Sequence, residues 1–250
     1  MHKPQIEIAR DSQDLAERMV QLFLAAADDA IASGGVFRTA LSGGRTPERF
    51  LERLANTPQA QDLPWDRVHL FWVDERCVPP DAQASNYRLV AETLLSRISI
   101  PAVNVHRIPT ESEDRSGAAR AYERTIREVF GLGEGEIPQF DLIVLGMGSD
   151  GHTASLFPNS PAVRCVDHLT CVVPAGSDVR LSRITLTKPV LLAARRLVVL
   201  VSGGEKARTL EAVLTGEPNE MRYPVQVLWP VLERVIWLVD HEAGSLMVDV

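Results

Sequence analysis

Short apolar runs alternate with segments of helical periodicity along this chain of 250 residues. The apolar runs have the length of strands and cover residues 5–9, 36–41, 68–73, 103–108, 140–145, 169–173, 184–186, 197–201 and 234–239. Apolar residues at helical spacing follow many of them, in segments 11–32, 85–96, 117–129 and 206–214 and in a helix that begins at Pro47. This alternation predicts an α/β fold: a mostly parallel, Rossmann-like sheet flanked by helices.

The chain shows no feature that would divide it into parts. Its length fits one large α/β domain or two small ones. It contains no internal repeat, no low-complexity segment and no long linker, and the glycine-rich acidic segment 131–136 is expected to be a connection. We therefore expect residues 1–250 to form a single domain.

Composition narrows the class of protein. Apolar residues make up 45% and charged residues 24% of the chain, which is ordinary for a globular protein. The net charge of -7 disfavours nucleic-acid binding, and no apolar run has the roughly 18 residues of a membrane span. The N-terminus lacks the pattern of a signal peptide. Cys77, Cys165 and Cys171 are odd in number and show no C-x-x-C spacing, so we expect free thiols in a reducing compartment. We expect a cytoplasmic protein.

The segment 141–158 is the most informative for function. An apolar strand ends in a glycine-rich turn that presents Gly148, Asp150 and His152. Ligands of open α/β sheets bind outside the carboxyl ends of the strands, so His152 is a candidate base with a nearby carboxylate to orient it. The alternative is an Asp-Gly turn with His152 in the first turn of a helix, but the surrounding glycines favour a functional site.

Two further strand ends carry serine-diglycine turns. The first contributes Ser42, Gly43, Gly44, Arg45 and Thr46, and the second, segment 202–206, contributes Lys206. Backbone N–H groups at a helix start bind anions, and these hydroxyl and cationic side chains would assist. The first turn matches neither a P-loop nor a dinucleotide fingerprint, and taken alone it is equally compatible with a tight turn that leaves Arg45 in solvent.

A charged triplet follows the apolar strand 68–73. Its position favours a functional role for Asp74 and Arg76, whereas Glu75 is expected to point elsewhere; a charged surface turn is the alternative. Arg183 is a further candidate cation, and its alternative is a solvated surface position.

Several kinds of site are disfavoured. No second His or Cys lies at ligand spacing from His152, so we expect no metal, and no other cofactor is indicated. Ser155 does not lie in the G-x-S-x-G turn of a serine hydrolase. Together, the four strand ends predict a small phosphorylated substrate and base-assisted chemistry.

Four segments together resemble the 6-phosphogluconolactonase family: 41–47, 72–76 with 85–87, 145–158 and 183–186. The resemblance spans roughly residues 35–210, and the run around His152 is its most specific part. It implies a fold like that of glucosamine-6-phosphate deaminase and ribose-5-phosphate isomerase. It also implies hydrolysis of 6-phospho-D-glucono-1,5-lactone to 6-phosphogluconate, the second step of the pentose phosphate pathway. Whether the chain is a monomer or a weak dimer stays open.

This resemblance suggests a mechanism. Neutral His152 would take a proton from the water that attacks C1 of the lactone, with either Asp150 or Asp74 orienting the imidazole. Backbone N–H groups near Gly44 or Gly148 would hold the oxyanion. The phosphate would lie among residues 42–46, Arg76 and Lys206, with Arg183 as a further candidate.

Two rival functions are weaker. In related deaminases a glutamate follows the histidine by five residues, but Phe157 stands there in this chain. A sugar-phosphate sensor of a transcription regulator would need a DNA-binding segment, and residues 1–35 offer one strand and one helix, too little for a helix-turn-helix.

Overall fold

A seven-stranded sheet forms the centre of the structure, a computed structural model that describes residues 3–176 and 179–247. Its order is β1-β10-β9-β6-β2-β3-β5, and all neighbouring strands are parallel. The strands are Gln5–Ala9 (β1), Phe37–Leu41 (β2), Val68–Trp72 (β3), Val105–His106 (β5), Leu142–Gly146 (β6), Leu197–Val201 (β9) and Val235–Asp240 (β10). The predicted α/β fold with a mostly parallel sheet is confirmed.

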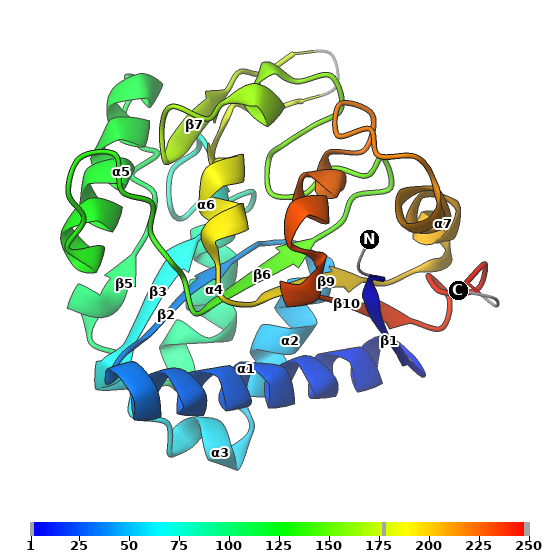
Figure 1. Cartoon of the computed structure of the whole chain (residues 1–250). Helices are drawn as coiled ribbons and strands as arrows, with labels where there is room; N and C mark the ends of the chain where they lie inside the picture. Colours follow the sequence, from blue (N-terminus) through cyan, green and yellow to red (C-terminus); the bar gives the residue numbers. More distant parts are fainter. Residues whose placement is uncertain (1–2, 177–178, 248–250) are drawn as a thin grey trace.

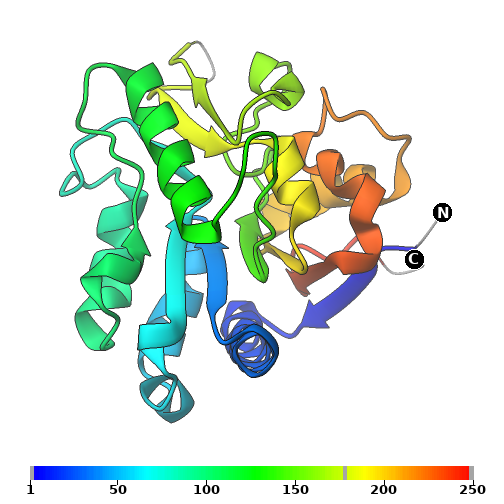
Figure 2. The ribbon, with the colours of Figure 1, turned by 60° about the vertical axis from the view of Figure 1, so that its left-hand side comes forward.

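Helices cover both faces of this sheet. On one face α1 and α2 pack against each other and against the strands, and α6 lies on the other (Figure 1; Figure 2 gives a second view). The α-helices are Ser12–Gly34 (α1), Arg45–Ala55 (α2), Pro58–Gln61 (α3), Asn86–Thr93 (α4), Arg115–Phe130 (α5), Lys188–Ala193 (α6) and Ala207–Thr215 (α7). Short 3₁₀ segments are Trp65–Arg67, Leu95–Arg97, Ala102–Asn104, Pro161–Arg164, Gly204–Lys206 and Pro224–Arg234.

The long helix α1 begins directly after Asp11, as predicted, and continues to Gly34, two residues beyond the expected segment. The Asp11 carboxylate accepts hydrogen bonds from the backbone N–H groups of Gln13 and Asp14, which have no partner within the helix. Gly35 ends the helix in the left-handed conformation, with φ of 77°.

A second, antiparallel sheet stands beside the first, in the order β4-β8-β7. It consists of Asp74–Arg76 (β4), Arg183–Leu186 (β8) and Thr170–Val173 (β7). The strands expected at 169–173 and 184–186 are confirmed, whereas residues 74–76, for which the sequence predicted no strand, form β4. These charged residues form a strand because they pair with β8, where Arg76 lies opposite Arg183. This small sheet brings Asp74 and Arg76 to the edge of the large one.

The strand expected at 103–108 is only two residues long in the structure. β5 pairs with Leu70 and Phe71 and goes no further along β3. At Trp72, the next residue of β3, the hydroxyl of Tyr122 on α5 provides the backbone hydrogen bonds instead. It accepts from the Trp72 N–H at 2.9 Å and donates to the Trp72 carbonyl at 2.8 Å. A buried side chain thus replaces the missing strand.

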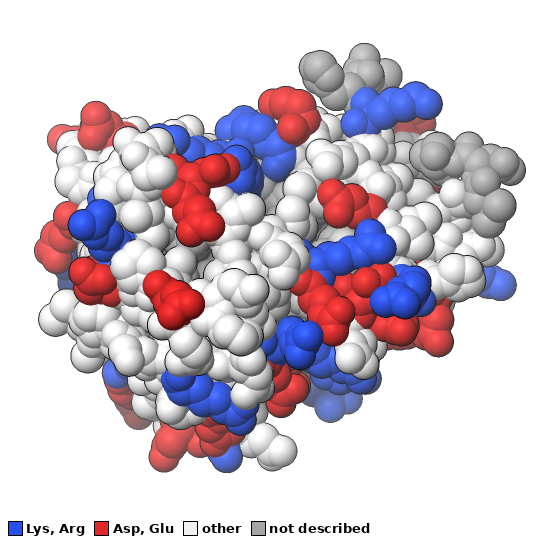
Figure 3. Space-filling view, turned by 90° about the horizontal axis from the view of Figure 1, so that it is seen from below, with Lys and Arg blue, Asp and Glu red and all other residues white. Residues whose placement is uncertain are grey.

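Acidic and basic side chains are interspersed on the face seen from below, where α1 lies (Figure 3). Ion pairs join some of them, such as Arg53 with Glu17 at 3.2 Å between α2 and α1. Among the described residues, no helix combines the length and apolar character that crossing a membrane requires.

Two histidines pair at the β3–β5 edge of the sheet. Nδ1 of His69 lies 3.0 Å from Nε2 of His106, so one ring donates a hydrogen bond to the other. The rings are stacked, and His106 also stacks on Phe71. Burial, and secondarily the neighbouring His69, lower the pKa of His106 to about 4, while burial and the nearby Arg38 lower the pKa of His69.

This pair predicts acid sensitivity of the fold. The unfolded chain binds a proton on His106 near the ordinary pKa of 6.5, whereas the folded chain binds it only near 4. The free energy of unfolding should therefore fall as pH decreases from about 6.5 to about 4. His106→Gln should flatten this slope in urea titrations at several pH values, whereas His168→Gln, at an exposed position, should keep it. Equal slopes in wild type and His106→Gln would contradict the assignment.

Candidate active site

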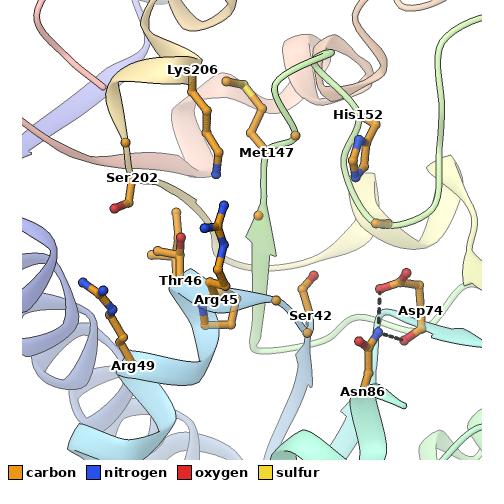
Figure 4. A pocket seen from close by; sticks show the side chains of 18 of the residues that line it. Ser42, Arg45, Thr46, Arg49, Asp74, Asn86, Met147, His152, Ser202 and Lys206 are labelled. Carbon is orange, nitrogen blue, oxygen red and sulfur yellow. Dashed lines mark hydrogen bonds between the residues drawn. The ribbon is translucent and has the colours of Figure 1, made fainter. Parts of the chain in front are cut away.

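One pocket lies where the carboxyl ends of β2, β6 and β9 meet the small sheet (Figure 4). Parallel strands all end at the same edge, so their loops converge there. The lining residues are Ser42, Gly43, Gly44, Arg45, Thr46, Pro47, Arg49, Asp74, Arg76, Asn86, Gly146, Met147, Gly148, His152, Ala154, Arg183, Leu200, Ser202, Gly203, Glu205 and Lys206.

The turn after β2 leads directly into α2. Gly44 adopts φ of 105°, a conformation that side chains other than glycine rarely take, and it places the first turn of the helix against the pocket. Gly43 is needed for a different reason: a Cβ there would lie 1.9 Å from Oδ1 of Asn86. The Ser42 hydroxyl is buried and has no hydrogen-bond partner among the described residues. This turn thus offers hydrogen-bonding groups to a ligand.

The turn after β9 faces the turn after β2 and is hydrogen-bonded to the end of β10. The Asp240 carboxylate accepts hydrogen bonds from the Ser202 hydroxyl at 2.6 Å and from the Gly203 N–H at 3.2 Å. Lys206 and Arg45 point toward the same space from the two turns (Figure 4), and Glu205 lies 3.9 Å from Arg45. Burial lowers the pKa of Lys206, with Glu205 opposing this effect.

The turn after β6 holds His152. The Gly151 N–H donates to the Gly148 carbonyl at 3.0 Å, and the Gly148 N–H donates to the His152 carbonyl at 2.9 Å, which closes a tight loop. Thr153 ties the loop to β6 through a 2.9 Å hydrogen bond from its hydroxyl to the Gly146 carbonyl. These bonds fix the backbone on both sides of the imidazole.

Asp150 is the hydrogen-bond partner of the imidazole. Its Oδ1 lies 2.6 Å from Nδ1 of His152 and also accepts from the His152 N–H at 3.1 Å. Burial raises the pKa of Asp150, but the hydrogen bond and charge interaction with His152 outweigh it and bring the pKa below its ordinary value. An ionised carboxylate only accepts, so Nδ1 carries a hydrogen, and in the neutral form of the ring Nε2 has the lone pair.

Gly148 makes this arrangement possible. A Cβ at residue 148 would lie 2.2 Å from Nδ1 and 2.3 Å from Cε1 of His152, and 2.6 Å from Oδ1 of Asp150. The paired side chains therefore rest directly on the Gly148 backbone, and a larger residue would displace them.

Asp74 has other partners than the imidazole. Its carboxylate is 4% exposed, accepts a hydrogen bond from the Ser155 hydroxyl and lies 3.6 Å from Arg183. Asn86 approaches it through Nδ2 at 3.4 Å. The sequence analysis left Asp150 and Asp74 as alternatives for orienting His152. In the structure, Asp150 lies at hydrogen-bonding distance from the imidazole.

Glu75 points away from the pocket, in agreement with the sequence prediction. Its carboxylate is buried and accepts from the backbone N–H groups of Arg76, Asn86 and Tyr87 and from the Ser85 hydroxyl. Burial raises the pKa of Glu75 in spite of these bonds. It fastens the start of α4 to β4.

Arg76 and Arg183 are cross-strand neighbours beside Asp74. Arg76 donates to the Ala84 carbonyl at 2.8 Å, and Arg183 lies over the ring of Phe157. Burial lowers the pKa of Arg183, with Asp74 opposing this effect. The cations of the pocket therefore come in two groups, one beside Asp74 and one at the two glycine turns.

All but one of the predicted site residues line this pocket, and the exception, Asp150, reaches it through His152. The sequence analysis missed Arg49; it included Ser202 and Glu205 in the predicted turn 202–206 and Asn86 in segment 85–87, but gave these three residues no individual role. Arg49 follows Arg45 by one helical turn, a spacing that would have revealed it. Asn86 lay within a segment that carried the family resemblance but received no role. Within residues 3–176 and 179–247, no three His, Cys, Asp or Glu side chains gather into a potential metal site.

Comparisons with known proteins agree with one another. The family described as glucosamine-6-phosphate isomerases/6-phosphogluconolactonase matches residues 10–237. A 6-phosphogluconolactonase of Synechocystis sp. is 39% identical over 242 residues, which cover 97% of this chain and 98% of the relative.

Solved structures share the fold. A 6-phosphogluconolactonase from Thermotoga maritima is 32% identical, with a TM-score of 0.81 over 95% of this chain and 100% of its own. A monomeric glucosamine-6-phosphate deaminase has a TM-score of 0.82 over 97% of this chain and 99% of its own. At 19% identity, the deaminase shows a common fold alone.

Gly148→Ala should displace the imidazole, because its methyl group would occupy the space of Nδ1. In a crystal structure of the variant, the 2.6 Å contact between His152 and Asp150 should be lost. Gly34→Ala is the matched control, since a Cβ there meets nothing within 4 Å. An unchanged imidazole position in Gly148→Ala would refute the proposed packing.

Proposed function

The chain belongs to the family of glucosamine-6-phosphate isomerases and 6-phosphogluconolactonases, and we infer that it hydrolyses 6-phosphogluconolactone. This is the second, hydrolytic step in the oxidative branch of the pentose phosphate pathway. The observation that carries the inference is an oriented imidazole in a pocket that also holds two glycine turns with cations.

We propose that His152 acts as the general base. Its Nε2 takes a proton from water as the water oxygen attacks C1 of the lactone, and the carbonyl electrons move to the oxygen. When the tetrahedral intermediate collapses, the C1–O5 bond breaks and the imidazolium returns its proton to O5. Asp150 stabilises the imidazolium through Nδ1. Because the ester carbonyl is already electrophilic and water attacks it directly, no covalent intermediate is needed.

We place the oxyanion of this intermediate near Gly44. The Gly148 N–H already donates to the His152 carbonyl, so it is engaged within the loop that holds the base. Gly44 and Arg45 lie at the N-terminus of α2, where unpaired N–H groups stabilise negative charge.

The substrate phosphate, in our proposal, lies at the first glycine turn and Lys206. Ser42, Gly43, Arg45 and Thr46 supply hydroxyl, N–H and guanidinium donors there, Lys206 approaches from the opposite turn (Figure 4), and the Gly44 N–H is left for the oxyanion. Phosphate-binding roles for Arg76 and Arg183 stay predictions.

Phe157 supports hydrolysis over deamination. Its ring centroid lies 4.5 Å from that of His152, at the position where related deaminases are expected to carry a glutamate. A phenyl ring transfers no proton. We further propose that the whole chain acts as one catalytic domain in the cytoplasm, where its three free cysteines would stay reduced.

His152→Ala should remove the base and leave the binding groups in place. Positioned base catalysis contributes about 10² to 10⁴ in rate, so kcat should fall by at least about 100-fold with little change in KM. The rate of lactone loss is measured after subtraction of the spontaneous rate. The matched control is His168→Ala, because His168 is exposed and lies outside the pocket; this variant should retain normal kcat. A His152→Ala enzyme with near-normal kcat would exclude this residue as the base.

Lys206→Ala should weaken phosphate binding and raise KM by about tenfold or more, the effect of losing a charge-assisted hydrogen bond of about 1.5–3 kcal/mol. Unphosphorylated gluconolactone should show no such change. Lys188→Ala is the matched control, because Lys188 pairs with Glu220 outside the pocket. If KM for the phosphorylated lactone is the same in Lys206→Ala and wild type, Lys206 does not bind the phosphate.

A further inference from the structure

Asn86 lines the pocket and has a buried acceptor atom with no hydrogen-bond partner among the described residues. It is the first residue of α4 and is 1% exposed. Its Nδ2 donates to the Asp74 carbonyl at 2.8 Å and approaches Oδ1 of the same residue at 3.4 Å. These two acceptors determine which end of the carboxamide is nitrogen. Oδ1 therefore faces the other way, is buried, and has no hydrogen-bond partner among the described residues.

The carboxamide is held in this position from both sides. Asp74 fixes Nδ2, and the Gly43 backbone lies against the other end, where a Cβ would be 1.9 Å from Oδ1 and 2.4 Å from Cγ. Figure 4 shows Asn86 beside Asp74, with Ser42 between this pair and the side of the pocket that carries Lys206. Asn86 thus lies on the Asp74 side of the first glycine turn, across Ser42 from Lys206.

The chemistry of the atom restricts what it binds. An amide oxygen accepts hydrogen bonds and donates none, so it repels phosphate oxygens and the lactone carbonyl. A buried acceptor without a partner destabilises the protein, and a hydroxyl group of a ligand would supply the missing hydrogen bond. The lactone ring carries free hydroxyls at C2, C3 and C4, and those at C2 and C3 lie toward the reacting carbonyl.

We propose that Oδ1 of Asn86 accepts a hydrogen bond from the C2 or C3 hydroxyl of the lactone, and so makes Asn86 a specificity-determining residue of the pocket. The proposal rests on the proposed function, because it assumes that the substrate is a polyhydroxy lactone. Gly43 would then contribute to substrate specificity in addition to forming the turn, because the absence of a side chain leaves room for the Asn86 carboxamide.

The test compares kcat/KM for 6-phosphogluconolactone with kcat/KM for its 2-deoxy and 3-deoxy analogues, each corrected for spontaneous hydrolysis. Wild type should prefer the parent lactone over one analogue by about tenfold, the effect of one hydrogen bond to a buried group. In Asn86→Ala this ratio should fall to nearly one. Because both substrates are measured on the same preparation, the ratio does not depend on how much of the variant is folded.

Two further variants complete the test. Gly43→Ala should lower the same ratio, because its methyl group would displace the carboxamide. Asn104→Ala is the matched control: Asn104 is a buried asparagine whose Nδ2 donates to the Asp66 carbonyl at 2.9 Å, outside the pocket, and its ratio should equal that of wild type.

The outcomes separate the two proposals. If wild type does not accelerate hydrolysis of the parent lactone, the proposed function fails. If wild type is active but Asn86→Ala keeps the wild-type preference against both analogues, only the role of Asn86 is overturned. An equal loss of preference in Asn104→Ala would also overturn it.

Discussion

The hydrogen bond between Asp150 and His152, seated on the Gly148 backbone, is the interaction on which the account of this site depends. It determines which imidazole nitrogen is free to accept a proton. The fold supplies its rigidity, since β6 lies between β9 and β2 in the sheet and delivers the loop to the pocket. The loop is then closed by its own backbone and tied down by Thr153, so the base is pre-oriented before substrate arrives.

Positive charge is concentrated in the pocket. The chain as a whole carries a net charge of -7, yet five cationic side chains line this pocket: Arg45, Arg49, Arg76, Arg183 and Lys206. Asp74 offsets Arg183, and Glu205 partly offsets Arg45. Buried polar atoms that have no hydrogen-bond partner in the described part of the chain also gather here, among them Ser42 Oγ and Asn86 Oδ1. Such atoms cost free energy in the empty protein, which is consistent with a site built to receive a polar ligand.

The sequence allowed much of this arrangement to be predicted, for identifiable reasons. Apolar runs followed by helical periodicity located the parallel strands, and the loops at their ends contained nearly all the site residues. The strand Asp74–Arg76 was missed because its charged residues lack an apolar pattern and depend on pairing with β8, which is distant in sequence. The choice between Asp150 and Asp74, and the position of Asn86 against Gly43, likewise required contacts between separate segments.

The tautomer of His152 tests the central claim most directly. A long-range ¹H–¹⁵N spectrum of the resting enzyme, recorded at a pH where it is active and assigned with His152→Ala, distinguishes a protonated ring nitrogen from a bare one. The account predicts hydrogen on Nδ1, bonded to Asp150, and a bare Nε2 facing the pocket. A spectrum in which Nε2 carries the hydrogen at that pH would contradict it, because such a ring has no lone pair with which to accept a proton from water.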